Sequence, residues 1–140
     1  NLFHLLLSME KLFEEQFKIT NITFELPDIP PEQTSIQADK KQIEQVLINV
    51  IKNALEAMGN NGSIRCEIES TEAPIKLKIL DSGPGISQAE HKNIFTPFYT
   101  TKSDGQGIGL MLVREILEAH KFPFKLYNHE DGGACFEVTF

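Results

Sequence analysis

Two asparagines, Asn49 and Asn53, stand four residues apart in a segment that is otherwise largely apolar. In a helix, both carboxamides lie on one face, one turn apart, with Lys52 near the same arc. Carboxamides on a core-facing helix cost free energy unless something binds them. Amide oxygens are good ligands for Mg²⁺, so the pair indicates a site for a hard cation that carries phosphate oxygens. Two solvent-facing or helix-bonding asparagines are the alternative.

A second block follows a predicted strand directly and reads Asp81-Ser82-Gly83-Pro84-Gly85-Ile86. An aspartate at a strand end, followed by two glycines, suits a nucleobase pocket. The carboxylate accepts hydrogen bonds from an exocyclic amine, and the glycines let a ligand approach the backbone. Adenine offers that amine, whereas guanine presents an acceptor at the equivalent edge. A Gly/Pro turn with an Asx hydrogen bond is the competing interpretation.

A third block, Phe95-Thr96-Pro97-Phe98-Tyr99-Thr100-Thr101-Lys102, joins three aromatic residues to a polar end. The aromatic residues could anchor one end of a loop whose other end stays free. Lys102 could then swing onto phosphates as a point charge. Surface aromatics packed on a sheet edge, beside a solvated lysine, are the alternative.

A fourth block, Gly105-Gln106-Gly107-Ile108-Gly109-Leu110, opens a predicted helix. Glycines at a helix start leave backbone N–H groups free to hold phosphate. The spacing is neither the GxGxxG of a dinucleotide fold nor a P-loop, because no Gly-Lys-Ser/Thr follows. A flexible linker is the other interpretation.

The elements that must position these blocks follow from hydrophobic periodicity and turn residues. Asp39 is expected to cap the helix that carries the asparagines. Alternating strands with one apolar face predict a sheet covered on one side. The fold class is therefore α+β: a two-layer α/β sandwich with a mixed, mainly antiparallel sheet and helices on one face. Helices are predicted over residues 2–17, 40–58, 87–94 and 108–120, strands over 22–26, 34–37, 63–70, 75–80, 124–129 and 134–140, and a hairpin turn at 131–133.

Size and composition narrow the function classes. The chain has 140 residues with 41% hydrophobic and 24% charged side chains, which suits one globular domain. Its net charge of −7 leaves no basic stripe for nucleic acid and disfavours a membrane-surface role. Cys66 and Cys135 belong to no CxxC or His/Cys cluster, which argues against zinc. They fit small apolar strand residues in a reducing compartment.

The order and spacing of the four blocks resemble the GHKL ATPase superfamily, and within it the catalytic domain of sensor histidine kinases. Residues 49–57 look like the N box, 81–85 the G1 box, 95–98 the F box and 105–110 the G2 box. The resemblance spans essentially the whole chain. It implies a Bergerat fold in a single ATP-binding catalytic domain over residues 1–140, located in the cytoplasm, with a membrane anchor left open for the parent protein.

The resemblance also assigns roles to individual residues. Asn53 would coordinate Mg²⁺, and Asn49 would assist near the phosphates. Asp81 would recognise adenine, and a lid running from about residue 98 to 105 would carry Lys102. Asn49 and Lys102 are thus the expected catalytic residues. The expected cofactor-binding residues are Asn53, Asp81, Gly83, Gly85, Ile86, Lys102, Gly105, Gly107, Gly109 and Leu110.

Position 49 separates the transferring members of this superfamily from the hydrolysing ones. Relatives that hydrolyse ATP carry a glutamate one turn before the metal-binding asparagine, as the base for water. Asn49 occupies that place here and cannot take a proton from water at neutral pH. The resemblance therefore implies that the γ-phosphate is presented to another nucleophile, with positioning and charge neutralisation supplying most of the catalysis.

The family's acceptor histidine lies on a dimerising helix outside this domain, and His4 is not expected to replace it. The expected partners are therefore a separate dimerisation domain and, indirectly, a response regulator, and the isolated chain is expected to be a monomer. His120 is followed by Lys121-Phe122 where the family often has two glycines, which is expected to alter a turn but not the pocket. An anti-sigma-factor-type serine kinase and a partner-binding pseudokinase are the alternatives.

Overall fold

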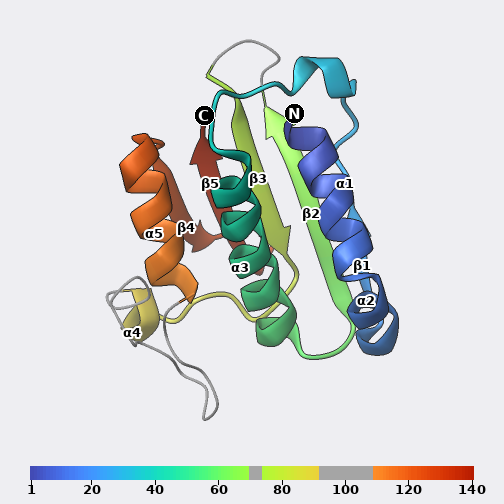
Figure 1. The fold of residues 1–140 in the computed structure, drawn as a ribbon. Coiled ribbons are helices and arrows are strands. Elements are labelled where there is room, and N and C mark those ends of the chain that lie inside the picture. Colours follow the sequence, from blue (N-terminus) through green and yellow to red (C-terminus); the bar gives the residue numbers. More distant parts are fainter. Residues whose placement is uncertain (70–73, 92–108) are drawn as a thin grey trace.

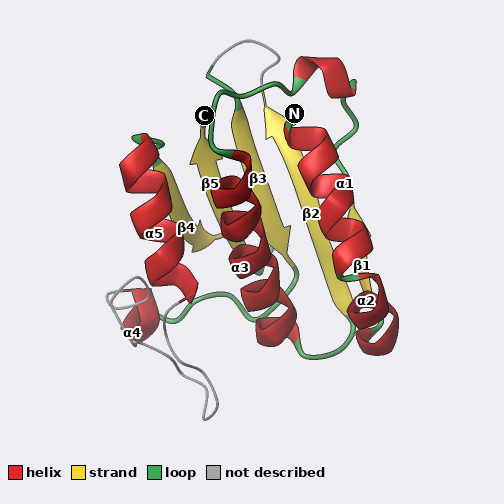
Figure 2. Cartoon of the chain, in the orientation of Figure 1, coloured by secondary structure: helices red, strands yellow, loops and turns green. Residues whose placement is uncertain are grey.

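A computed structural model describes residues 1–69, 74–91 and 109–140. In this part of the chain, one mixed sheet of five strands carries helices on one face (Figures 1 and 2). The predicted two-layer α+β sandwich is confirmed. The elements are α1 (Leu2–Leu12), α2 (Glu14–Thr20), β1 (Ile22–Glu25), the 3₁₀ helix η1 (Pro31–Gln33), α3 (Lys40–Met58), β2 (Gly62–Glu69), β3 (Lys76–Asp81), α4 (Gln88–His91), α5 (Gly109–His120), β4 (Phe124–Asn128) and β5 (Ala134–Thr139).

The sheet order is β1-β2-β3-β5-β4. Strand β1 runs parallel to β2, and the other neighbouring pairs are antiparallel. Strand β5 therefore lies between β3 and β4, so the hairpin turn before β5 reaches the end of β3. This arrangement places the block that starts at Asp81 beside the turn between β4 and β5.

The core lies between the sheet and the helices. Asp39 caps α3 as predicted, its side chain accepting a hydrogen bond of 3.0 Å from the backbone N–H of Gln42. Apolar residues three and four apart on α3 then form one buried stripe. Both layers contribute to the core, which includes Ile43, Val46, Leu47, Val50 and Ile51 from α3 and Ile64, Cys66, Leu77, Ile79, Phe136 and Val138 from the sheet.

Two predicted elements differ in the structure. The helix expected over residues 2–17 is two helices, which meet at the buried Phe13 (φ −100°, ψ 5°) and continue to Thr20. The strand expected over residues 34–37 is wrong. Thr34 donates its backbone N–H to Pro31 (3.1 Å), and its carbonyl accepts from Leu2 (2.8 Å), so its backbone caps the start of α1 instead of joining the sheet.

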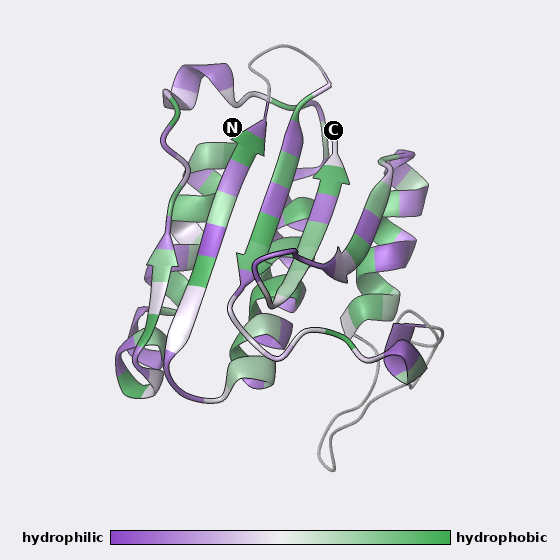
Figure 3. Cartoon of the chain, turned by 180° about the vertical axis from the view of Figure 1, so that it is seen from behind, coloured by the Kyte–Doolittle hydropathy of each residue, from purple (hydrophilic) through white to green (hydrophobic). Residues whose placement is uncertain are grey.

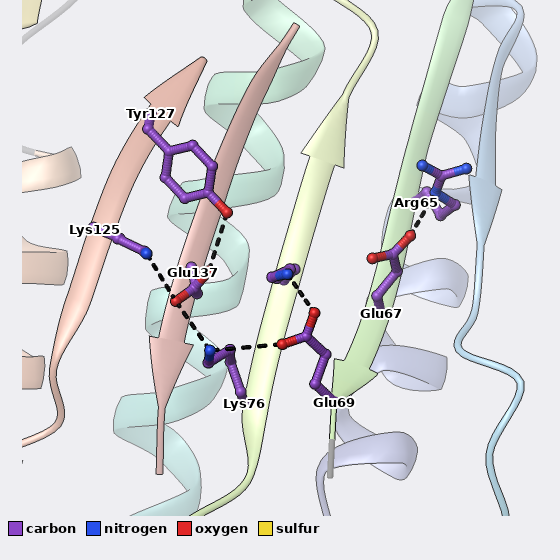
Figure 4. Close-up of polar contacts among 8 residues, drawn as sticks. Arg65, Glu67, Glu69, Lys76, Lys125, Tyr127 and Glu137 are labelled. Carbon is purple, nitrogen blue, oxygen red and sulfur yellow. Dashed lines mark hydrogen bonds and ion pairs between the residues drawn. The ribbon is translucent and has the colours of Figure 1, made fainter. Parts of the chain in front are cut away.

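Polar and apolar residues alternate along the strands (Figure 3), so the polar residues share the sheet face opposite the helices. Its charged side chains pair across four strands (Figure 4). Glu137, only 7% exposed, accepts a hydrogen bond from Tyr127 (3.0 Å) and lies 3.3 Å from the Lys125 Nζ. Burial raises the pKa of Glu137, but the bonds from Tyr127 and Lys125 outweigh it and leave that pKa lowered. The charged side chains of this face therefore pair with one another within the domain. The same face also contains the buried residues Cys135 and Leu80.

No helix in the described part of the chain is both long and apolar enough to cross a membrane. Of the helix predicted over residues 87–94, residues 88–91 form α4, Ser87 precedes it, and residues 92–94 fall outside the described residues.

Candidate functional site

Asp81 ends β3, and its carboxylate is held in one orientation. Its Oδ1 accepts hydrogen bonds from the backbone N–H groups of Gly83 (2.8 Å) and Ala134 (3.3 Å). Within the described residues, both hydrogen bonds to this carboxylate reach the same oxygen. Burial raises the pKa of Asp81, and the two backbone bonds offset that rise only in part. The arrangement leaves Oδ2 available to accept a hydrogen bond from a ligand.

Glycines surround Asp81 because larger residues would collide with it. A Cβ atom on Gly83 would lie 2.9 Å from Oδ1 of Asp81 and 3.2 Å from the Cγ of Met58. A Cβ atom on Gly133 would lie 1.8 Å from the Asp81 carbonyl oxygen, a distance that no side chain could tolerate. Gly133 has φ +80°, which also favours glycine. Sequence reasoning treated Gly133 as part of a hairpin turn and missed this contact, which joins residues 52 positions apart.

The residue after Asp81 is fixed by β2. The backbone N–H of Ser82 donates to the carbonyl of Ser63 (3.1 Å), and the hydroxyl of Ser82 accepts from the N–H of Ser63 (2.9 Å). A side chain thus continues the β2–β3 pairing one step beyond the strand. Sequence reasoning also missed this pair, since neither serine belongs to a motif by itself.

The helix α3 carries the two asparagines of the first block. Asn49 donates one N–H of its Nδ2 to the Gln45 carbonyl (2.8 Å), so one of its two donors is used within the helix. The Asn53 Nδ2 is buried and has no hydrogen-bond partner among the described residues. A buried, unpaired amide group costs on the order of 1–3 kcal/mol. Asn53 is therefore the polar group of α3 that most needs a ligand.

The start of α5 lies beside Asn49. A Cβ atom on Gly109 would be 3.1 Å from the Oδ1 of Asn49, so glycine permits the close approach. Leu110, the next residue, is partly buried against the core. At its C-terminal end, α3 reaches Gly83 through Met58. The half of the helix from Asn49 to Met58, which is roughly 13 Å long, therefore connects the fourth block to the second.

The structure thus brings together predicted residues from three blocks. Gly83, Gly85 and Ile86 follow Asp81 in the loop after β3, and Gly109, which precedes Leu110, meets Asn49 on α3. Lys52 is exposed. The predicted Lys102, Gly105 and Gly107, together with the third block, lie outside the described residues. The geometry offers an acceptor near the C-terminal end of α3 and, at the middle of this helix, the Asn49 carboxamide facing the glycine that starts α5.

This fold and this site define a class of ATP-binding domain. The sequence profile described as "Histidine kinase-, DNA gyrase B-, and HSP90-like ATPase" matches residues 38–140, so the chain belongs to this family and binds ATP.

Within this family, the individual relatives described below are histidine kinases. The sensor histidine kinase ZraS of Escherichia coli O157:H7 is 38% identical over 117 residues, covering 84% of this chain and 25% of ZraS. The solved catalytic domain of histidine kinase ThkA is 36% identical with a TM-score of 0.84, covering 98% of this chain and 90% of that domain. ThkA in complex with the response regulator protein TrrA matches at 30% identity and a TM-score of 0.78, covering 100% of this chain and 40% of that one.

The chain is thus the ATP-binding catalytic domain of a histidine kinase, and the predicted family is confirmed. The serine-kinase alternative is not favoured, because these relatives are histidine kinases. The chain spans about a quarter of the length of the curated relatives that it matches.

Proposed function

We propose that this domain binds Mg-ATP and transfers the γ-phosphate to a histidine on a separate dimerisation domain of a longer polypeptide. The observation that carries the proposal is the Asp81 carboxylate, whose Oδ1 holds both backbone hydrogen bonds while Oδ2 remains available. An acceptor in a partly desolvated position suits the exocyclic amine of adenine. The same position would meet an oxygen at the corresponding edge of guanine, so it favours adenine.

Asn53 is the proposed Mg²⁺ ligand. Its Nδ2 is buried without a partner among the described residues, and as a hydrogen-bond donor it would suit a phosphate oxygen of the nucleotide. Its carboxamide oxygen is a suitable ligand for a hard cation. When bound, the ion would offset charge on the triphosphate. On the chain itself, the task of Asn53 is to hold the metal and the phosphates in one place on α3.

Asn49 is proposed to position the phosphates and not to activate water. One N–H of its Nδ2 donates to the Gln45 carbonyl, and its Oδ1 faces the start of α5 at Gly109. A carboxamide cannot accept a proton at neutral pH, so the site lacks the base that hydrolysis would use at this position. Gly109 and Leu110, with Lys102, Gly105 and Gly107 before them in the sequence, would close the phosphate end.

The acceptor histidine is proposed to belong to another domain of the parent protein. The chain corresponds to a quarter of ZraS, which leaves room for further domains in such proteins. His4 lies in α1 on an exposed position and has no place beside the Asp81–Asn49 site. We accordingly propose residues 1–140 as one catalytic domain that works in the cytoplasm, is a monomer in isolation and serves a response regulator indirectly.

A labelling experiment tests this proposal. The purified chain is incubated with Mg²⁺ and γ-³²P-ATP, alone and with a dimerisation domain of the parent that carries the acceptor histidine. We expect no label on the chain alone and an acid-labile, base-stable label on the added domain, as phosphohistidine requires. An acid-stable label would indicate a hydroxyl acceptor and contradict the proposal. Absence of ATP binding in parallel calorimetry would contradict it at the first step.

A further inference from the structure

A side chain outside all four sequence blocks holds the loop that follows Asp81. Asn128, the last residue of β4, accepts a hydrogen bond at Oδ1 from the backbone N–H of Ile86 (2.7 Å). Its Nδ2 donates to the carbonyl of the same residue (2.9 Å). Donor and acceptor on one side chain thus satisfy both polar groups of Ile86, as a neighbouring strand would. Asparagine and glutamine are the side chains that offer a separate donor atom and acceptor atom in a neutral amide.

Gly85 leaves room for the contact between Asn128 and Ile86. A Cβ atom there would lie 2.7 Å from the Oδ1 of Asn128 and 3.3 Å from its Cγ. The φ of Gly85 is +77°, a backbone conformation that side chains rarely adopt. Glycine at position 85 therefore allows Asn128 to approach closely and also allows the backbone conformation that the loop requires.

The loop from Asp81 to Ile86 is held at both ends by the β4–β5 hairpin. At its start, the N–H of Ala134 donates to the Asp81 carboxylate, and Gly133 packs on the Asp81 carbonyl. At its end, Asn128 holds Ile86. The same hairpin thus determines both the orientation of the base-reading carboxylate and the path of the backbone beside it.

A capping box begins immediately after this anchor. The N–H of Ser87 donates to the Glu90 carboxylate (2.8 Å), and the N–H of Glu90 donates to the Ser87 hydroxyl (3.3 Å). The hydrogen bonds from Ser87 hold the pKa of Glu90 below its usual value. Helix α4 therefore starts two residues after Ile86, the residue that Asn128 holds. The position of Ile86 sets both the end of the loop and the start of α4.

We infer that Asn128 is a positioning residue of the nucleotide site. It holds Gly85 and Ile86 against the hairpin, so the loop after Asp81 is preformed before ATP arrives. Without Asn128, ATP binding must first order the loop. The free-energy cost of that lost backbone freedom makes the binding free energy less favourable. The inference rests on the proposed function, because it assigns this loop to the base end of the ATP site.

Calorimetric titration of the purified chain with Mg-ATP tests the inference. Asn128→Ala removes both hydrogen bonds to Ile86, and we expect the Kd to rise about fivefold or more. Asn128→Asp keeps the acceptor for the N–H but places a carboxylate oxygen against the Ile86 carbonyl, so its Kd should rise as well. Tyr127→Phe is the matched control: it changes the adjacent residue and removes the bond to Glu137 on the open sheet face. Its Kd should stay within about twofold of the parent.

Two further measurements separate positioning from mere stabilisation. Thermal melts without nucleotide give the stability of each variant, and amide hydrogen exchange at Ile86 reports the loop directly. We expect faster Ile86 exchange and weaker ATP binding in Asn128→Ala at a temperature where circular dichroism shows it folded. If Asn128→Ala does not fold, Asn128→Asp supplies the same comparison.

Each outcome has a definite meaning. A lower melting temperature with an unchanged Kd in the folded variant would overturn the inference, because Asn128 would then only support the fold. Unchanged Ile86 exchange would overturn it as well. If the parent binds ATP and the variants bind equally well, the inference fails while the proposed function stands. If the parent itself does not bind Mg-ATP, the proposed function fails.

Discussion

Replacing Asp81 with asparagine should change the base preference of the site, and the structure says which way the new amide will face. Both backbone donors, from Gly83 and Ala134, point at Oδ1. An asparagine must therefore keep its oxygen at that position and place its nitrogen where Oδ2 now lies. A donor would then face the exocyclic amine of adenine. The same donor would match the oxygen that hypoxanthine carries at this position.

The expected loss of affinity follows from the free energy that a hydrogen bond to a charged group contributes, about 1.5–3 kcal/mol. Asp81→Asn should therefore weaken Mg-ATP binding by a factor of roughly 10–150. Mg-ITP should bind the variant at least as tightly as it binds the parent. Calorimetry with both nucleotides measures the change, and the ratio of the two Kd values does not depend on small differences in active protein.

Asp131→Asn is the matched control, because it makes the same chemical change on a side chain that is 89% exposed in the β4–β5 turn. It should leave both affinities unchanged. Equal losses for ATP and ITP in Asp81→Asn would indicate general damage to the site. Unchanged affinities for both nucleotides would show that Asp81 does not touch the base, and the reasoning from its hydrogen bonds would be refuted.

Three other predictions concern stability and metal binding. Burial raises the pKa of Asp81, so its ionised form costs stability at neutral pH and the cost disappears as pH falls below the unfolded-state pKa. Asp81→Asn should thus be more stable than the parent at pH 7 in denaturant titrations, with the difference shrinking on acidification; a growing difference would contradict the sign. Asn53→Ala should abolish the Mg²⁺-dependent rise in melting temperature with ATP without lowering that of the free chain, since its Nδ2 has no partner among the described residues. Lys121→Gly should stabilise the chain by about 1 kcal/mol, because Lys121 has φ +61° and only glycine adopts that conformation without strain; an unchanged or lower melting temperature would argue against it.

The Lys121 conformation also explains the departure from the family pattern at this turn. The sequence has Lys121-Phe122 after His120, where two glycines are common in the family. In the structure, Lys121 still takes the left-handed conformation that ends α5, and Phe122 stacks on the His120 ring at 5.4 Å. The ring of His120 accepts a hydrogen bond from the N–H of Asp39 (3.4 Å). The altered turn thus packs beside the start of α3 and not at Asp81.

Local patterns in the sequence were enough to predict much of this domain. The period of apolar residues on α3 determines which face enters the core, and Asp39 determines where the helix begins. Strict alternation in β2 and β3 determines which strand face is buried. The chemistry of the first two blocks is also local: residues four apart share a helix face, and an aspartate at a strand end is followed by the glycines that let a ligand approach.

Other features depend on residues far apart in the chain, and periodicity carries no information about them. Alternation predicts strands but not that β5 lies between β3 and β4, which is what brings Gly133 onto Asp81 and Asn128 onto Ile86. Thr34 resembles a strand residue locally, yet its hydrogen bonds go to the start of α1. Sequence determined which residue types the site contains. Tertiary structure decided which oxygen of Asp81 is free and what holds the loop beside it, because strand register and long-range hydrogen bonds fix both.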